Sequence, residues 1–163
     1  MGIMQRYLEE IRTILEKVEN TQSGAMEQAA DMLCTAILGG HTVFAFGTNH
    51  AGLLAQELYY RTGGLAVVNY VRMPGLALDV DPPTLTTDIE RMPGYGRAIV
   101  DAKPMREGDV LILHSVSGRN AVPIDAALRA REKGVRTICL TNLATSSAVP
   151  ARHAGGKNLY EVC

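Results

Sequence analysis

The chain has 163 residues, of which 47% are hydrophobic and 20% are charged, a composition typical of one globular domain with a sizeable core. Its formal net charge of -1 at pH 7 argues against a broad positive surface of the kind that binds nucleic acid or anionic lipid. The three cysteines lack metal-ligand spacing and indicate reduced thiols, so we expect neither a metal nor a cofactor.

The first forty residues have the pattern of two helices. Apolar residues recur at helical spacing over residues 3–19, with charged residues between them, and again over residues 26–37. Gly39 and Gly40 follow and are expected to end the second helix. We expect this helical part, residues 1–40, to supply either a dimer surface or a layer that packs on the protein's own sheet.

The N-terminal segment does not have the pattern of a targeting signal. It contains several glutamates in place of a basic stretch followed by an apolar one, and no apolar run in the chain reaches membrane-spanning length. We therefore predict a cytoplasmic protein that has no membrane or nucleic-acid partner.

Residues 41–163 alternate between short β-rich runs and helical patterns and form one predicted globular unit. The strand patterns cover residues 41–46, 65–71, 110–114 and 135–141. The helical patterns cover residues 51–61, 94–103 and 121–133, and the proline-containing stretch 73–93 is expected to be irregular. This alternation predicts an α/β fold with a doubly wound, mostly parallel sheet and helices on both faces. Ligands of such sheets bind at the carboxyl ends of the strands.

The last residues, 158–163, contain no apolar strand or helix that could close the sheet. A sheet that stopped here would leave an exposed edge strand, which proteins usually cover. We expect either that the chain is a fragment that lacks the last strand and C-terminal helices, or that a partner chain covers this edge.

The strongest local signal for binding is the loop after the third predicted strand. Ser115, Ser117 and Asn120 offer side-chain donors, Gly118 permits a tight turn beside Arg119, and the following helix would present free N–H groups at its start. This combination predicts a phosphate site that needs no lysine. The alternative of equal weight is an ordinary turn with a serine helix cap.

The loop after the first predicted strand has the same placement. It contains Gly47, Thr48, Asn49 and His50, and the two polar side chains Thr48 and Asn49 could donate to the same phosphate or to sugar hydroxyls. The loop lacks both the dinucleotide glycine fingerprint and the Walker lysine, so its signal is weak by itself. Two polar loops at carboxyl ends of strands favour a ligand site more than either loop does alone.

A carboxylate on the helix that leaves the first loop is a candidate base. Glu57 lies in a largely apolar helical stretch, where it could take a proton from a carbon next to a carbonyl. The alternative is a salt bridge to Arg61, one helical turn later. His50 precedes Glu57 by seven residues, so both are predicted to face the same side of that helix.

Two segments resemble the sugar isomerase (SIS) superfamily, in particular the second half of phosphoheptose isomerase. They are GDVLILHSVSGRN at residues 108–120 and AREKGVRTICLT at residues 130–141. A bacterial family of SIS proteins without an assigned reaction is also similar. That similarity runs through AQELYYRTGG at 55–64, ERMPGY at 90–95, SGRNAVPI at 117–124 and RHAGGK at 152–157.

The resemblance implies a flavodoxin-like SIS domain that binds a sugar phosphate. It assigns the phosphate to Ser115, Ser117 and Asn120, places further donors at Thr48 and Asn49, and gives Glu57 the role of base. The implied reaction is sugar-phosphate isomerisation through an enediol, in a homodimer or homotetramer. A lyase or etherase that uses Glu57 or Glu90, and a sensor without catalysis, are the alternatives.

Two departures from phosphoheptose isomerase bear on the reaction. Leu53 stands where that family has a histidine that binds zinc, so the resemblance does not extend to a metal. The second acid/base histidine of that family lies in a C-terminal helix that this sequence does not reach.

Overall fold

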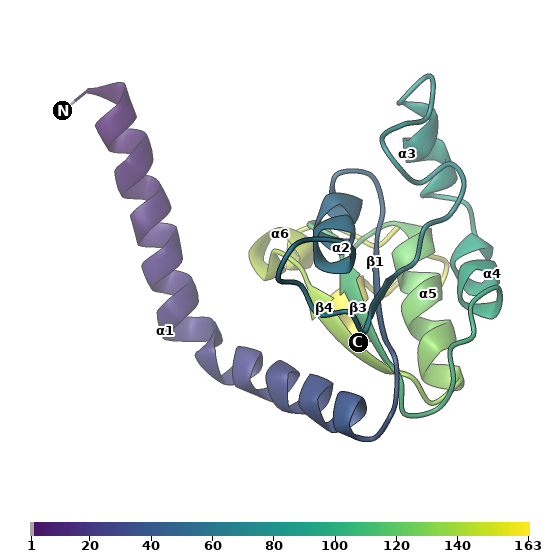
Figure 1. The fold of residues 1–163 in the computed structure, drawn as a ribbon. Coiled ribbons are helices and arrows are strands. Elements are labelled where there is room, and N and C mark those ends of the chain that lie inside the picture. Colours follow the sequence, from purple (N-terminus) through teal and green to yellow (C-terminus); the bar gives the residue numbers. More distant parts are fainter. Residues whose placement is uncertain (1) are drawn as a thin grey trace. The chain divides into compact units, whose positions relative to one another are not determined.

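The computed structural model describes residues 2–163 and divides into two compact units, one that ends at Thr35 and one from Ala36 to Cys163 (Figure 1). The first unit consists of a helix, and the second contains a parallel sheet with its covering helices. In residues 2–163, no helix has the length and apolar character that a membrane span requires.

The N-terminal part is one helix, α1 (Ile3–Leu38), where the sequence predicted two. No proline interrupts it, and its one internal glycine, Gly24, costs only about 1 kcal/mol relative to alanine. The hydroxyl groups of Thr21 and Ser23 donate to backbone carbonyls four residues earlier. Hydroxyl groups bonded in this way bend helices without ending them, and α1 bends near its middle (Figure 1).

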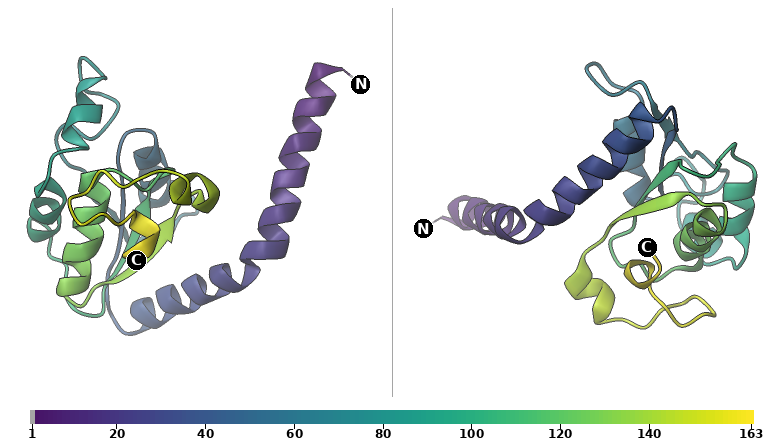
Figure 2. Two further views of the ribbon diagram at one scale, coloured as in Figure 1. Left: turned by 180° about the vertical axis from the view of Figure 1, so that it is seen from behind. Right: turned by 90° about the horizontal axis from the view of Figure 1, so that it is seen from below.

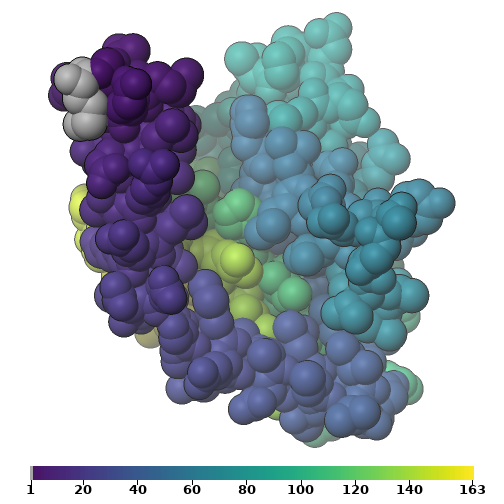
Figure 3. All heavy atoms as spheres, turned by 60° about the vertical axis from the view of Figure 1, so that its left-hand side comes forward, coloured from purple at the N-terminus to yellow at the C-terminus, as the bar shows by residue number. Residues whose placement is uncertain are grey.

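Many apolar side chains of α1 are exposed. The side chains of four of them, Ile3, Tyr7, Ile14 and Leu15, each keep more than half of their surface exposed. Figure 3 draws the heavy atoms of this helix as spheres, in purple, as seen from one side. Apolar side chains repeated along one helix without a covering layer are typical of an association surface.

The second unit is built on a four-stranded, all-parallel sheet, as the sequence predicted. The strands are β1 (Val43–Gly47), β2 (Val68–Tyr70), β3 (Val110–His114) and β4 (Arg136–Leu140). They are ordered β2-β1-β3-β4, and all three pairs are parallel. All five residues of β1 are buried, which agrees with its short apolar sequence and its central position.

Helices cover both faces of the sheet (Figures 1 and 2). The connection from β1 to β2 carries α2 (Ala51–Tyr59), and the connection from β3 to β4 carries α5 (Ala121–Glu132). These two connections run across the sheet in opposite directions. Because parallel crossovers are right-handed, their helices lie on opposite faces. The connection from β2 to β3 carries α4 (Tyr95–Asp101), which packs beside α5.

The strand order β2-β1-β3-β4 predicts a crevice between the carboxyl ends of β1 and β3. The chain leaves the carboxyl end of β1 toward one face and that of β3 toward the other, which is the switch point where ligands of open α/β sheets bind. Both loops that the sequence singled out, residues 47–50 and 115–120, begin at this point.

The remaining segments are short and lie around the sheet. The stretch 73–93, predicted to be irregular, contains one short helix, α3 (Leu85–Ile89). After β4 come α6 (Leu143–Ser147) and a 3-10 turn, η1 (Leu159–Glu161). Leu159 is fully buried in the core, so this last segment packs against the sheet unit.

Candidate functional site

The two loops meet because β1 and β3 are paired in register. Gly47 lies opposite His114, so the residues that follow each of them emerge side by side. The ring of His114 reaches across this junction, with its Nδ1 3.0 Å from the carbonyl oxygen of Ala51. A carbonyl can only accept, so Nδ1 is the protonated nitrogen in this contact. His114 therefore ties β3 to the start of α2.

The loop 115–120 has one tightly constrained position, at Gly118. Its φ of 59° lies in the left-handed region, and an added Cβ would come within 3.1 Å of both Leu159 Cβ and Ser146 Oγ. The backbone N–H of Gly118 donates to Ser115 Oγ at 3.2 Å. Glycine at this position lets the loop turn sharply, as the sequence predicted.

The turn leaves several hydrogen-bond donors open. Among residues 2–163, the backbone N–H groups of Ser117, Arg119 and Asn120 have no protein acceptor, and neither does the hydroxyl of Ser117. Unpaired N–H groups on both sides of a left-handed residue form a concave anion site. These donors are suited to the oxygens of a phosphate group.

The start of α5 contributes less than the sequence analysis expected. Val122 donates its N–H to the carbonyl oxygen of Glu90 at 3.1 Å, and Pro123 has no N–H. Two of the first three helical positions therefore offer no free N–H group to a ligand. The prediction of several free N–H groups there was wrong, and Pro123 was the visible signal against it.

Thr48 and Asn49 direct their side chains to Glu90. Thr48 Oγ1 donates to Glu90 Oε1 at 2.6 Å, and Asn49 Nδ2 donates to Glu90 Oε2 at 2.8 Å. Glu90 is largely buried, with only 8% of its surface exposed. In this arrangement the two donors of the first loop hold a carboxylate at the mouth of the crevice, forty residues away in sequence.

The three candidate catalytic residues do not form one cluster. Glu57 is exposed and makes an ion pair with Arg61, with 2.7 Å between Oε1 and Nη1, as the alternative interpretation proposed. His50 is exposed just before α2. Glu90 alone is in contact with both polar residues of the first loop.

Arg152, which the sequence analysis did not single out, contacts the second loop. Its backbone N–H donates to the carbonyl oxygen of Arg119 at 2.7 Å, and its Nη1 donates to Asn120 Oδ1 at 2.9 Å. Desolvation, followed by repulsion from Arg119 and Arg91, lowers the pKa of Arg152, while Glu90 acts in the opposite direction. Arg91 and Arg152 thus lie close to the site through tertiary contacts that no local pattern reveals.

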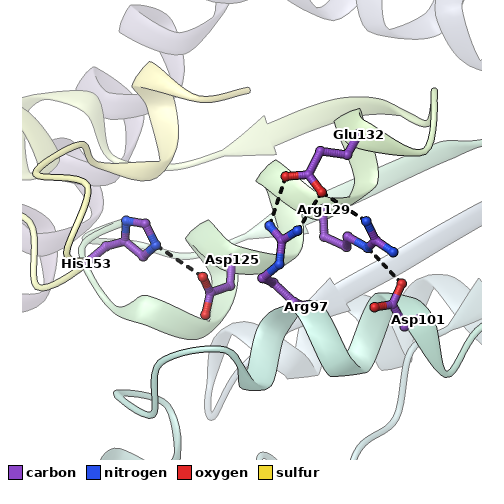
Figure 4. Close-up of polar contacts among 6 residues, drawn as sticks. All are labelled: Arg97, Asp101, Asp125, Arg129, Glu132 and His153. Carbon is purple, nitrogen blue, oxygen red and sulfur yellow. Dashed lines mark hydrogen bonds and ion pairs between the residues drawn. The ribbon is translucent and has the colours of Figure 1, made fainter.

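A hydrogen-bonded histidine holds the segment that carries Arg152. His153 Nε2 lies 3.1 Å from Asp125 Oδ1 (Figure 4). The backbone N–H of Gly94 donates to the other carboxylate oxygen at 2.6 Å. The N–H of Gly155 donates to His153 Nδ1 at 3.0 Å. Both ring nitrogens are engaged, so His153 is a structural residue next to the site.

A hollow of the surface lies away from these loops. A groove of about 530 Å³ runs between α2, the end of β2 and the segment after it, and no residue of the loop 115–120 lines it. Its lining includes the aromatic side chains Tyr59, Tyr60 and Tyr70. Within residues 2–163, no three histidine, cysteine or carboxylate side chains are grouped as metal ligands.

Sequence comparison relates the chain to a known domain and to curated bacterial proteins. The SIS domain matches residues 6–142. A UPF0309 protein of Shouchella clausii and one of Oceanobacillus iheyensis are each 43% identical over 162 residues, and one of Streptomyces coelicolor is 38% identical over 159. The matches cover 97–99% of this chain but only 63–66% of the relatives, so the chain spans slightly less than two thirds of their length.

Structure comparison finds two phosphoheptose isomerases. The enzyme of Neisseria gonorrhoeae superimposes with a TM-score of 0.65 and 23% identity, covering 93% of this chain and 80% of the isomerase. That of Francisella tularensis gives a TM-score of 0.58 and 20% identity, covering 94% and 84%. At these identities the match establishes the fold.

Proposed function

Because the chain belongs to the SIS domain family, we propose that it binds a sugar phosphate in the crevice between β1 and β3. The phosphate would lie against the loop 115–120, where the N–H groups of Ser117, Arg119 and Asn120 and the Ser117 hydroxyl point to no protein acceptor. This set of unpaired donors is the observation that carries the proposal. Ser115, whose hydroxyl oxygen accepts from Gly118, shapes the turn and keeps its own proton to donate.

The sugar would extend from the phosphate toward the first loop. Gly47 comes so close to α2 that an added Cβ would lie 2.5 Å from the carbonyl oxygen of Ala51, so this loop packs tightly against the start of α2. Thr48 and Asn49 lie next, with Glu90 between them and the second loop. A sugar placed here would meet a carboxylate held in a fixed orientation.

We further propose aldose–ketose isomerisation through an enediol, with Glu90 as the base. Its carboxylate would take the proton from the carbon next to the carbonyl, giving the enediol, and return it to the neighbouring carbon. Two hydrogen bonds fix the carboxylate for this transfer, whereas Glu57 is held in a surface ion pair. His50, exposed at the start of α2, is the candidate for moving the proton between the two sugar oxygens. Elimination by the same base is the lyase alternative.

One observation favours a second candidate function, a sensor that binds without turnover. Both carboxylate oxygens of Glu90 are hydrogen-bonded inside the protein, and the residue is largely buried. A carboxylate that only joins the first loop to the segment after α3 would make the same hydrogen bonds and be equally buried. Solvent-isotope exchange separates the two functions, because only proton transfer through an enediol replaces the carbon-bound hydrogen of the sugar by deuterium.

Binding is tested by calorimetry and thermal unfolding with sugar phosphates and their unphosphorylated parents. A ligand at a hundred times its dissociation constant should stabilise the protein by about 2.7 kcal/mol. Ser117→Ala removes a hydrogen bond to a charged group, worth about 1.5–3 kcal/mol, and should weaken sugar-phosphate binding roughly ten- to a hundredfold. Ser147→Ala, at an exposed serine of α6, is the matched control and should change nothing. Equal affinity of Ser117→Ala and the parent would contradict the proposal.

We also propose that the protein forms a homodimer or homotetramer through α1. The exposed apolar side chains of that helix support this assembly. Sedimentation should give a dimer or tetramer for the parent, whereas Ile14→Glu combined with Leu15→Glu should give monomer. A parent that sediments as a monomer at high concentration would count against the assembly.

A further inference from the structure

Three arginines that the proposed phosphate loop does not require meet near the start of α5. Arg119 and Arg152 are joined by a backbone hydrogen bond of 2.7 Å. Arg91 directly follows Glu90, whose carbonyl oxygen accepts from Val122 at the first turn of α5. Arg91, Arg119 and Arg152, here called the arginine cluster, therefore come from three separate segments to one place beside the crevice.

The positive charge of the arginine cluster is not balanced within the protein. Among residues 2–163, none of its members makes an ion pair, whereas surface arginines such as Arg61, Arg97 and Arg129 do. The carboxylate of Glu90 lies nearby, but its two oxygens accept from Thr48 and Asn49. Arginines close together without a carboxylate partner create a positive local potential that attracts an anion.

Two independent features show that the cluster is incomplete. The Nε atom of Arg119 is buried and has no hydrogen-bond partner among the described residues. A buried donor without an acceptor costs free energy that a bound ligand recovers. Desolvation, followed by repulsion from Arg119 and Arg91, also lowers the pKa of Arg152, which agrees with a positive local potential.

A single phosphate does not need both sets of donors. Three backbone N–H groups and the Ser117 hydroxyl already provide at least one donor for each of the three terminal oxygens of a phosphate ester. Arg152, in contrast, is directed to the side chain of Asn120, at the end of the loop next to Glu90. The guanidinium group of Arg152 thus lies on the Glu90 side of the loop, where a second anionic group of the ligand would meet it.

We infer that the natural ligand is a sugar phosphate that carries a second anionic group, a carboxylate or a second phosphate, bound by the arginine cluster. This inference rests on the proposed function, since it places the first phosphate at the loop 115–120. Guanidinium groups bind carboxylates and phosphates through paired N–H donors, so both groups share the chemistry that the cluster would recognise.

The test compares two ligand pairs that differ by one anionic group. Glucose 6-phosphate is compared with 6-phosphogluconate for a carboxylate, and fructose 6-phosphate with fructose 1,6-bisphosphate for a phosphate. Affinities are measured by calorimetry at one fixed, low ionic strength, because such contacts are screened by salt. The second anion should raise the affinity of the parent at least tenfold in one pair or both.

The variants Arg152→Gln and Arg91→Gln should remove this gain while leaving the affinity for the monophosphates within about threefold. Arg91 is exposed and its side chain makes no hydrogen bond within residues 2–163, so its replacement should not disturb folding. Lys17→Gln, an exposed position on α1, controls for the loss of one positive charge. Ser117→Ala should weaken all four ligands alike.

The possible failures are distinct. If Arg152→Gln and Arg91→Gln weaken both members of each pair equally, the guanidinium groups bind the first phosphate and the inference is overturned, while the proposed function stands. If the second anion gives no gain in the parent, the inference is overturned as well. If none of the four ligands binds, the proposed function fails together with the inference.

Discussion

His153 donates a hydrogen bond from Nε2 to Oδ1 of Asp125, across 3.1 Å (Figure 4). The direction follows from the other ring nitrogen, because Nδ1 accepts from the N–H of Gly155 and cannot carry a proton in that contact. Asp125 accepts from Gly94 with its second oxygen. The buried carboxylate therefore joins α5, the start of α4 and the segment that carries Arg152.

Asp125→Asn should destabilise the protein and misplace Arg152. An amide has one acceptor oxygen, so it cannot accept from both Gly94 and His153, and one donor loses its partner. The loss of a hydrogen bond to a charged group is expected to cost about 1.5–3 kcal/mol of unfolding free energy, measured by urea titration. Binding of doubly anionic sugar phosphates should weaken more than binding of monophosphates.

His153→Gln provides the comparison for this variant. A glutamine side chain carries an N–H donor that can replace Nε2, so its cost should be smaller than that of Asp125→Asn. If Asp125→Asn unfolds at the same urea concentration as the parent, the carboxylate does not hold these segments together.

Glu132 gives the surface near this site a pH dependence. Hydrogen bonds from Arg97 and Arg129 lower its pKa to about 2, and Arg129 also bonds Asp101 (Figure 4). The pKa of Glu132 is lower in the folded protein than the usual 4.5. Its stabilisation of the folded protein is therefore complete above about pH 4.5 and is lost as the pH falls toward 2.

Glu132→Gln should therefore lower the melting temperature at pH 7, and the difference from the parent should shrink between pH 4.5 and 2. Salt should reduce the difference at pH 7, since all three side chains are partly exposed. Thermal unfolding across this pH range measures both effects. A constant difference down to pH 2 would exclude Glu132 as the titrating group.

The fold was largely predictable because its strands are short apolar runs between turn residues. All four lie where the sequence placed them, and the alternation of strands and helices sufficed for the parallel sheet. The helix α1 was predicted as two helices because the apolar helical spacing is interrupted over residues 20–25, which include Asn20, Ser23 and Gly24. In a long helix without proline, such residues reduce propensity without ending the helix.

The loops of the site were predictable, but the partners of their side chains were not. Thr48 and Glu90 are separated by forty-two residues, and only the folded chain brings them within 2.6 Å. The same holds for Arg152, which reaches Asn120 across thirty-two residues. Local patterns identify polar loops at strand ends, whereas the pairing of donors with acceptors is a property of tertiary structure.

Gly118→Ala should test the conformation of the loop 115–120, the proposed phosphate site. A left-handed backbone costs a residue with a Cβ about 1–2 kcal/mol, and here the added atom would also crowd Leu159 and Ser146. We expect reduced stability in thermal unfolding and weaker sugar-phosphate binding. Gly156→Ala is the matched control, since its φ of 67° imposes the same backbone strain while nothing lies within 4 Å of an added Cβ. Comparable losses in the two variants would show that crowding at Gly118 contributes nothing.

Thr48→Val separates the two loops by function. Valine has nearly the same shape but no hydroxyl, so Glu90 loses the donor on Oε1, while the loop 115–120 keeps its phosphate donors. If Thr48 holds Glu90, affinity for sugar phosphates should stay within about threefold of the parent, and deuterium exchange into the sugar should fall at least tenfold.

Glu90→Gln should abolish exchange while binding persists, because an amide cannot accept the proton. Glu57→Gln should leave exchange unchanged if Glu90 is the base and abolish it if Glu57 is. A large loss of affinity in Thr48→Val would instead assign this hydroxyl to the phosphate, and absence of exchange in the parent would favour the sensor.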